Sequence, residues 1–365
     1  MVEKQFRAAL ISLGSKSSKM TAAAMEKYFK EVDMLQIKDI EIQLGERNPL
    51  LYQGQPMPTY DCIYIKGSFR YAVIARSITS LLSGEAYMPY LAGSFTTVHD
   101  KILTHIQLQS QGVPMPKTYL SATVGAAKNL LKSLNYPVIM KFPQGTQGKG
   151  VMFADSYAAA SSVLDALESL KQPFLIQDYI ETSGVDVRAF VVGDKVVAAM
   201  KRKAASGEKR SNVHAGGTTE VFKIPKEMEN VAIRTAKAMG AEICGVDILE
   251  SVKGPVVIEA NLSPGLQGIT QASGRDIADD VAKHLYVRTQ EFRSSKPTPN
   301  AQQILDELEV EDGGVMDVNS LVGSVDFRGA RILLPEIASK ATGITSSDEC
   351  VITFEKGRVE VKKGI

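Results

Sequence analysis

The residues of this sequence best suited to chemistry begin with the glycine-rich run "KFPQGTQGKGV" at positions 141–151. It is not a Walker A motif, because only two residues separate Gly145 from the pair Gly148-Lys149 and no Ser or Thr follows the lysine. It is not a dinucleotide-binding fingerprint, because a strand is expected to begin at Val151 and no helix N-terminus is left for a phosphate. The run therefore predicts a hairpin loop. Its amides and Lys149 could close over a polyphosphate, or its glycines could only permit a tight turn.

Lys141 stands at the start of this run and directly follows the apolar residues "YPVIM". A lysine at the end of a buried strand costs several kcal/mol unless it has a partner, and an anionic ligand is one such partner. The alternative is a side chain whose apolar stem is buried while its ammonium group reaches solvent.

A second group of residues follows from pairing the strands "ICGVDIL" and "PVVIEANL" in a hairpin. If a three-residue loop at 252–254 joins them, Asp247 lies directly opposite Glu259, and Asn261 shares the face of Glu259. Two carboxylates on one patch of an apolar hairpin repel each other unless a cation lies between them. Ligation by oxygen atoms alone favours Mg²⁺ or Mn²⁺ over zinc. Alternatively, these side chains line the solvent face of an edge hairpin.

The third stretch, "KRKAASGEKRSNVHAGG" at 201–217, holds five basic residues and one acidic residue. It is typical of a positively charged flap that could close on phosphates or carboxylates, or of a solvated basic loop. The four histidines show no metal-ligand spacing, and no local pattern indicates a covalent nucleophile. Taken together, the three stretches indicate nucleoside triphosphate chemistry without a protein nucleophile.

The elements that must position these residues predict a fold of mixed α/β and α+β class. Residues 1–93 alternate apolar strands, at 6–13 and 61–65, with helices near 19–32 and 70–82, which is typical of a small doubly wound α/β domain. Residues 94–293 combine hairpins with helices and form the expected catalytic domain. The polar, proline-containing stretch 294–302 is the expected linker, and 303–365 is a small β-rich domain.

Composition excludes several classes of protein. Lys and Arg number 42 against 41 Asp and Glu, so the overall charge gives no reason to expect nucleic acid or a membrane surface as a partner. The three cysteines lie far apart without a CxxC spacing, which favours free thiols in the cytoplasm. No apolar run approaches the roughly 18 residues needed to span a bilayer.

The order of these parts resembles the ATP-grasp superfamily, and within it the RimK-type glutamate ligases. The resemblance covers about residues 90–293 and rests on "KFPQGTQGKGV", "IQDYIETSGVDVRAFVVGDKVVAAMKRKA", "KRSNVHAGG", "GVDILES" and "VIEANLSPGLQGI". It implies an ATP-grasp fold that binds ATP and Mg²⁺ or Mn²⁺. The first ninety residues are similar to the family only in outline.

The resemblance also assigns roles to single residues. It implies that Lys101 and Lys141 contact the ATP phosphates and that the loop with Gln144, Gly145, Gly148, Lys149 and Gly150 closes over them. Gln177, Asp178, Tyr179 and Ile180 would hold the adenine edge by backbone groups, Asp186 would lie near the ribose, and Arg210, Ser211 and Asn212 would belong to the nucleotide and acceptor end. Asp247, Glu259 and Asn261 match the metal ligands, whereas Arg188, Arg202, Asn212, Ser263 and Gly265 are candidates for holding substrate carboxylates.

The chemistry implied by the resemblance joins a carboxylate to an amine. The carboxylate attacks the γ-phosphate of ATP to form an acyl phosphate, and an amino acid, expected to be glutamate, displaces phosphate to leave an amide, ADP and phosphate. The acceptor is an acidic group on a protein C-terminus or a glutamate-bearing small molecule. The alternative is a catalytically silent nucleotide-binding regulator whose tail binds DNA or a partner protein.

The tail "RGARILLPEIASKATGITSSDECVITFEKGRVEV" at 328–361 resembles the AbrB/MazE swapped-hairpin domains, which form intertwined dimers and often bind DNA. Residues 301–365 hold twelve acidic and seven basic residues, and a net charge of −5 opposes contact with a phosphate backbone. We therefore expect a homo-oligomer or docking onto the ligase rather than DNA binding, with a small β-cap without a partner as a further alternative.

Overall fold

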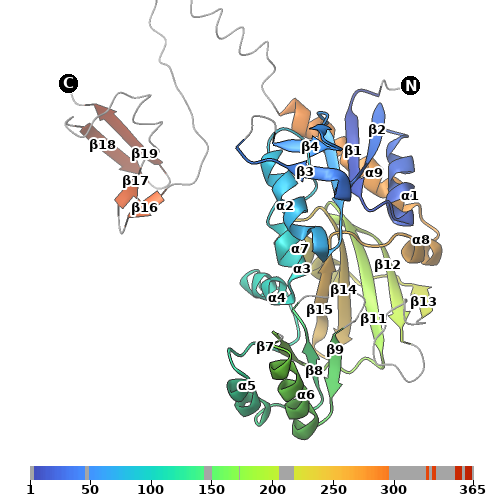
Figure 1. The fold of residues 1–365 in the computed structure, drawn as a ribbon, viewed down its shortest axis with the longest axis vertical. Coiled ribbons are helices and arrows are strands. Elements are labelled where there is room, and N and C mark those ends of the chain that lie inside the picture. Colours follow the sequence, from blue (N-terminus) through green and yellow to red (C-terminus); the bar gives the residue numbers. More distant parts are fainter. Residues whose placement is uncertain are drawn as a thin grey trace, which may run out of the picture. The chain divides into compact units, whose positions relative to one another are not determined.

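The computed structural model describes residues 4–45, 49–143, 150–171, 173–204, 218–295, 326–328, 331–333, 350–355 and 358–363. The chain divides into two compact units, Met1–Lys296 and Pro297–Ile365. The first unit contains an N-terminal part, a central antiparallel sheet and a small lobe, which lie in that order from top to bottom in Figure 1. Within the described ranges, no helix has both the length and the hydropathy needed to cross a membrane.

The N-terminal part is built on a three-stranded parallel sheet with the order β2-β1-β6. A second sheet, β3-β4-β5, is antiparallel and small. The elements are β1 (Arg7–Ser12), α1 (Lys16–Met25), β2 (Glu31–Gln36), η1 (Ile37–Asp39), β3 (Ile40–Ile42), β4 (Leu50–Tyr52), β5 (Gln55–Pro56), β6 (Cys62–Lys66), η2 (Phe69–Tyr71) and α2 (Ala72–Leu81).

The helix expected near 19–32 differs from the observed one at both ends. Helix α1 begins at Lys16, because the hydroxyl oxygen of Ser15 accepts a hydrogen bond from the amide of Ser18 and caps the helix. It ends at Met25. Residues from Glu31 onward instead form β2 and pair in parallel with β1, so tertiary pairing outweighs the helical pattern of the last residues.

The small lobe has a hydrophobic core of its own. It comprises β7 (Thr118–Tyr119), α5 (Val124–Leu131), β8 (Val138–Lys141), β9 (Val151–Ala154), α6 (Tyr157–Ser169) and β10 (Leu175–Asp178), with the sheet order β7-β10-β8-β9. Leu131, Met140, Leu164 and Ile176 are buried at its centre. Strands β8 and β9 pair antiparallel, which confirms the hairpin expected around the glycine-rich run and the strand start at Val151.

The central sheet has the order β13-β12-β11-β14-β15, and every neighbouring pair is antiparallel. Helix α7 packs against β11, β12, β14 and β15. The strands are β11 (Val185–Val192), β12 (Lys195–Lys203), β13 (Thr218–Val221), β14 (Ile243–Ser251) and β15 (Gly254–Asn261), and the accompanying helices are α3 (Ser94–His99), α4 (Lys101–Ser110), α7 (Lys226–Ala238), α8 (Gln267–Ser273) and α9 (Ile277–Ser294). The buried side chains of this sheet and of the N-terminal part form one continuous core.

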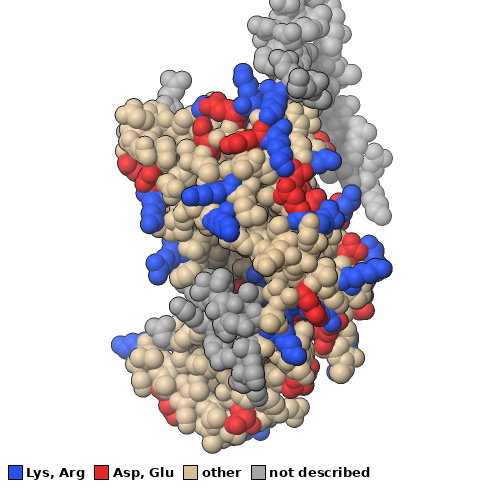
Figure 2. All heavy atoms as spheres, turned by 90° about the vertical axis from the view of Figure 1, so that its right-hand side faces the viewer, with Lys and Arg blue, Asp and Glu red and all other residues tan. Residues whose placement is uncertain are grey.

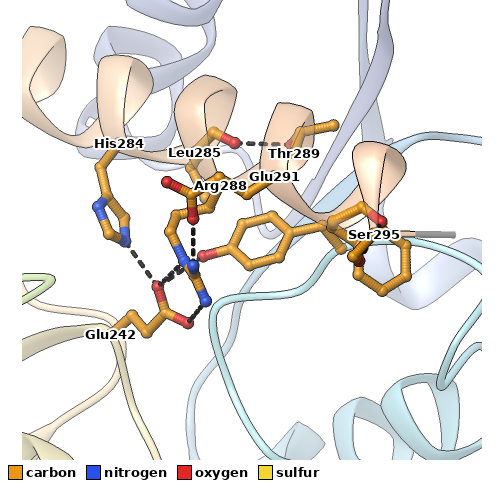
Figure 3. A network of polar contacts seen from close by, with 9 residues as sticks. Glu242, His284, Leu285, Arg288, Thr289, Glu291 and Ser295 are labelled. Carbon is orange, nitrogen blue, oxygen red and sulfur yellow. Dashed lines mark hydrogen bonds and ion pairs between the residues drawn. The ribbon is translucent and has the colours of Figure 1, made fainter.

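Glu242, which precedes β14, ties three segments together (Figure 3). Its carboxylate accepts hydrogen bonds from Tyr87 at 2.9 Å, from His284 at 2.8 Å and from Arg288 at 3.0 and 3.2 Å. Burial opposes ionisation of this carboxyl group, but the donors outweigh burial and lower the pKa of Glu242 to about 2. The network therefore joins α9 and the N-terminal part to the central sheet through a charged carboxylate.

The surface charge of the first unit is mixed. On the face shown in Figure 2, basic and acidic side chains lie among one another instead of gathering into one large patch of a single sign. The overall charge of the chain is +1 and that of residues 301–365 is −5, so residues 1–300 carry a net charge of +6, which on this face is spread as single basic side chains among acidic ones.

In the second unit, the described residues form two antiparallel hairpins. Strand β16 (Asp326–Arg328) pairs with β17 (Arg331–Leu333), and β18 (Cys350–Glu355) pairs with β19 (Arg358–Lys363). Residues 334–349, which connect the two hairpins, lie outside the described residues. The likeness to the swapped-hairpin domains stays a prediction.

Candidate functional site

A cavity of about 1010 Å³ lies where the N-terminal part, the small lobe and the central sheet meet. Fourteen of the residues predicted from the sequence line it: Lys101, Lys141, Gln177, Asp178, Tyr179, Ile180, Asp186, Arg188, Arg202, Asp247, Glu259, Asn261, Ser263 and Gly265. Gly150 directly precedes Val151, which also lines the cavity. Gln144, Gly145, Gly148, Lys149, Arg210, Ser211 and Asn212 lie outside the described residues.

The hairpin β14–β15 places Asp247 opposite Glu259, as the sequence predicted. The predicted length of the loop was wrong by one residue, however. Ser251 pairs with Gly254, so the turn has two residues and not three. A bulge after Asp247 sets Ile248 opposite Val257, and the additional residue in β15 restores the pairing of the two acids.

Charged residues form a row across the central sheet on the cavity side. Arg202 on β12 donates to Asp186 on β11 through two bonds of 2.6 Å and also pairs with Asp247 on β14 at 2.8 Å. Arg188 on β11 donates to both oxygens of Asp247, at 2.7 and 2.6 Å. These contacts follow from the register, since Asp186 lies opposite Arg202 and Arg188 lies opposite Asp247.

The two arginines predicted to hold substrate carboxylates thus hold protein carboxylates in this structure. The side chain of Arg202 is only 8% exposed, whereas that of Arg188 is 19% exposed and more accessible from the cavity. Each guanidinium group uses its Nε and Nη2 atoms in these pairs. Five N–H donors are available on an arginine, so the Nη1 edge of Arg188 is the part suited to a substrate.

The two acids of the hairpin titrate in opposite directions. Burial disfavours the charge of Asp247, but Arg188 and Arg202 outweigh burial and hold the pKa of Asp247 below its usual range. Burial and then the charge of Asp247 raise the pKa of Glu259, against the opposing effect of Lys101. Ionised Glu259 therefore gains from any further positive charge beside it.

The oxygen donors of this hairpin fit a hard divalent cation. Glu259 and Asn261 both line the cavity, and Oδ1 of Asp247 accepts one hydrogen bond, which leaves it a lone pair. Among the described residues there is no cluster of three or more His, Cys, Asp or Glu side chains that could hold a metal. Two carboxylates and one amide would thus supply part of a coordination shell, and Mg²⁺ usually completes its shell with water and phosphate oxygens.

A hydrogen-bond chain orients the side chain of Lys141. Nδ1 of His105 lies 2.6 Å from the carbonyl oxygen of Lys101, which can only accept, so Nδ1 carries the proton. Burial lowers the pKa of His105 to about 4, so Nε2 of the neutral ring accepts from Nε2 of Gln177 at 2.9 Å. The same amide nitrogen donates to Thr118 at 2.8 Å, which leaves Oε1 of Gln177 to accept from Nζ of Lys141 at 2.6 Å.

Lys141 is 9% exposed, as expected for a lysine at the end of a buried strand. Burial lowers its pKa to about 8, and nearby Lys101 acts in the same direction against Glu259. Its contact with Gln177 is to a neutral amide oxygen, which does not neutralise its charge. The prediction that an anion completes this environment stays open, while the alternative of an ammonium group in solvent does not fit the burial.

Gly150 occupies a position that only glycine can adopt without rearrangement. Its φ of +78° lies in the left-handed region, and a Cβ atom there would come within 2.2 Å of the Phe142 ring. The amide of Phe142 donates to the carbonyl of Gly150 at 3.1 Å and closes the base of the hairpin. The glycine is therefore required by the hairpin itself.

The cavity also contains residues that we did not predict from the sequence. Ser17, Lys66 and Gly67 bring the N-terminal part into its wall, and Phe153 contributes an aromatic ring that packs edge-on against Tyr179. A signal for Lys66 was present, because it follows the apolar strand "DCIYI" just as Lys141 follows "YPVIM".

Comparisons with known proteins agree with this geometry. A sequence model of the RimK-like ATP-grasp domain matches residues 98–285. A probable alpha-L-glutamate ligase of Vibrio atlanticus (strain LGP32) is 37% identical over 298 residues, which cover 79% of this chain and 94% of that protein. The chain belongs to the RimK-like ATP-grasp family. It is accordingly an enzyme of the RimK type that forms carbon–nitrogen bonds in an ATP-dependent reaction.

Solved structures show the same fold. A RimK domain ATP-grasp protein from Sphaerobacter thermophilus DSM 20745 aligns with a TM-score of 0.61 at 20% identity, covering 76% of this chain and 98% of that one. The ATP-grasp ligase PsnB, complexed with a phosphomimetic variant of its minimal precursor, Mg and ADP, aligns with a TM-score of 0.60 at 17% identity, covering 78% and 98%. The family match ends at residue 285, before the second unit begins.

Proposed function

We propose that this enzyme adds L-glutamate to a carboxylate acceptor through an acyl phosphate, with ATP and Mg²⁺, and releases ADP and phosphate. One observation carries the proposal. A single cavity brings the lysines Lys101 and Lys141 together with the oxygen donors Asp247, Glu259 and Asn261. Transfer of the γ-phosphoryl group of ATP to a carboxylate needs both positive side chains and a hard-metal site within one enclosure.

ATP fits the cavity with its adenine between the small lobe and the central sheet. Ile139, Phe153 and Ile180 offer apolar walls from the small lobe side, and Leu249 and Ile258 offer them from the hairpin. Backbone groups near Asp178–Ile180 would read the adenine edge, as the family resemblance implies. The phosphates then extend toward Lys101 and Lys141, whose positive charges favour them.

The metal site of the proposal consists of Asp247, Glu259 and Asn261. Bound Mg²⁺ would neutralise part of the negative charge on the phosphates and so favour attack by a carboxylate. The protein residues have distinct tasks beside it. Arg188 and Arg202 keep Asp247 ionised and oriented, and the chain from His105 through Gln177 directs Lys141 toward the phosphates.

The reaction then proceeds in two steps. The acceptor carboxylate attacks the γ-phosphorus, the bond to the bridging oxygen of ADP breaks, and the acyl phosphate forms. The neutral amine of glutamate next attacks the carbonyl carbon, the bond from this carbon to the phosphate oxygen breaks, and the amine nitrogen gives up one proton to the departing phosphate as the amide forms. Water would hydrolyse the acyl phosphate, so the site must exclude water during the reaction.

For the second unit we propose a role in association with another protein. Its two hairpins and the net charge of −5 over residues 301–365 support a small domain that associates with another protein, such as a second copy of this chain, rather than with DNA. Light scattering of the full chain against a chain ending at residue 296 tests this: equal oligomeric states would contradict it.

The test of the ligase proposal is ATP consumption by the purified full chain with Mg²⁺, screened against each amino acid. Mass spectrometry identifies the nucleotide product and any amide. We expect ADP and phosphate to appear with glutamate and to be accompanied by poly-glutamate or a glutamylated acceptor. Release of AMP and pyrophosphate, or turnover that needs a different amino acid, would contradict the proposal.

A further inference from the structure

Lys66 is a second buried lysine in the cavity, and the reaction proposed above leaves it without a role. It ends β6, is 5% exposed and lines the cavity. Its ammonium group lies 3.4 Å from the carbonyl oxygen of Pro264 and 5.4 Å from the centre of the Tyr64 ring. Within the described part of the chain, no carboxylate forms an ion pair with it, and burial lowers its pKa to about 8.

The position of Lys66 in the sheet is one where α/β proteins bind ligands. Strand β1 is the middle strand of the parallel sheet and pairs with β2 along one edge and with β6 along the other. The chain leaves β1 through α1 and enters β2, and it returns to the opposite side of β1 as β6. The carboxyl ends of β1 and β6 therefore flank the point where the strand order reverses, and ligands bind outside such points in open parallel sheets.

Helix α1 begins at the same place and adds positive potential. It has ten residues, and its N-cap Ser15 lines the cavity together with Ser17 and Ser18 of the first turn. The N-terminus of a helix carries a partial positive charge and unpaired amide donors, and both favour an anion.

The turn after β15 closes this end of the cavity. Ser17 donates to Oε1 of Gln267 at 2.8 Å and accepts from the amide of Leu266 at 2.9 Å, while the hydroxyl of Ser263 accepts from the amide of Gly67 at 3.0 Å. The turn is thereby attached to the N-terminal part. In the portion of the lining that comes from residues 13–68 and 263–267, no described residue is acidic.

We propose that Lys66 and the N-terminus of α1 bind a carboxylate of the glutamate-type substrate, namely one that does not react. This inference rests on the ligase function proposed above. The reacting carboxylate must lie beside the groups that hold the phosphates and the metal, Lys141 and Glu259, which the small lobe and the hairpin supply. A second carboxylate, which belongs either to the acceptor or to the incoming amino acid, then lies at the end of the cavity that the N-terminal part forms.

Two sources can supply this carboxylate: the incoming amino acid and the acceptor. Two probes separate them. L-Glutamate can occupy either place, whereas N-acetyl-L-glutamate has no free amine and can occupy only the place of the acceptor. The probes are titrated calorimetrically into the full chain in the presence of ADP and Mg²⁺, with wild type, Lys66→Met and Lys66→Gln compared.

We expect either substitution at Lys66 to weaken binding by about tenfold to a hundredfold, because a charge-assisted hydrogen bond is lost. Loss for L-glutamate alone assigns the carboxylate to the incoming amino acid, and loss for N-acetyl-L-glutamate assigns it to the acceptor. The matched control is Lys38→Met, an exposed lysine of the same part that does not line the cavity, and it should bind both probes as wild type does. The KM for ATP should stay unchanged in all variants.

Two results would overturn the inference. One is that wild type binds neither probe, and the other is that folded Lys66→Met and Lys66→Gln bind both probes as tightly as wild type. Circular dichroism of the variants establishes that they are folded. If wild type binds a probe through Lys66 but no amino acid triggers ADP release, the carboxylate site stands and the ligase proposal fails.

Discussion

Replacing Lys141 by methionine should make the ligand-free enzyme more stable at neutral pH while it removes most of its activity. Burial lowers the pKa of Lys141 from its usual 10.5 to about 8. This difference corresponds to about 3 kcal/mol of unfavourable free energy for the charged form in the folded state. Methionine has a similar length and no charge, so the substitution removes this cost.

One lost contact opposes the gain. Oε1 of Gln177 loses the donor at 2.6 Å, and a buried acceptor without a partner costs about 1–3 kcal/mol. We therefore expect Lys141→Met to unfold with a free energy about 1 kcal/mol higher than wild type at pH 7. Activity should fall by about 10²- to 10³-fold in kcat/KM, because a charge that stabilises the transferring phosphoryl group is lost.

The pH dependence gives the prediction its sharpest form. The folded-state pKa is lower than the unfolded one, so the cost of the buried charge is complete below pH 8, decreases as pH rises from 8 and is absent above 10.5. Above that pH the only remaining difference is the hydrogen bond to Oε1 of Gln177, which the variant lacks, so the variant should then be the less stable protein. The stability difference between variant and wild type thus changes sign between pH 7 and about pH 10.

Urea unfolding at pH 7, 8, 9 and 10, together with ADP release at pH 7, measures both effects. Lys132→Met is the matched control: Lys132 is exposed in the same lobe, and its variant should match wild type in stability and activity. A variant that is less stable than wild type at pH 7, or a stability difference that does not change with pH, would refute the argument that Lys141 carries a buried charge.

Three further predictions follow from the site and its supports. Glu259→Gln should leave the fold intact and abolish Mg-dependent turnover and the Mg²⁺ dependence of ATP binding by calorimetry, and unchanged activity would refute the metal assignment. Gly150→Ala should destabilise the small lobe by about 1–3 kcal/mol in urea unfolding, because the Cβ atom meets Phe142 and φ is positive; wild-type stability would show that the hairpin adjusts without cost. Because the pKa of Glu242 is lowered to about 2, the ionised side chain stabilises the fold fully above pH 4.5, and this contribution is lost as the pH falls through 2. Glu242→Gln should therefore lower the midpoint of thermal unfolding at pH 7 and have a smaller effect on it near pH 2, and an equal effect at both pH values would contradict the argument.

The strands of the central sheet show which strands the hydrophobic pattern of the sequence can predict. The two apolar runs that we expected to pair as strands, "ICGVDIL" and "PVVIEANL", form β14 and β15 in the structure, because the side chains of a sheet that is buried on one face alternate or are continuously apolar. Strands β2 and β13 were not expected. Their residues are partly exposed and polar, so only their neighbours in the sheet make them strands.

The pair Asp247 and Glu259 shows where a correct prediction rested on an incomplete reason. We expected a three-residue loop, and the structure has a two-residue turn together with a bulge in β15. A bulge depends on how two strands twist against each other and against their neighbours, so the hairpin sequence alone does not reveal it.

By itself, the sequence determined the chemistry available to this protein: a lysine after a buried strand, a glycine loop and two acids in one hairpin, in the order found in RimK-type ligases. Only the tertiary structure decided which of these side chains meet. Arg188 and Arg202 bind Asp247, His105 orients Gln177 toward Lys141, and Lys66 reaches the cavity from a different part of the chain. The physical reason is that ion pairs and buried hydrogen bonds form between residues that are distant in sequence, and packing of separate elements around one cavity brings them within reach.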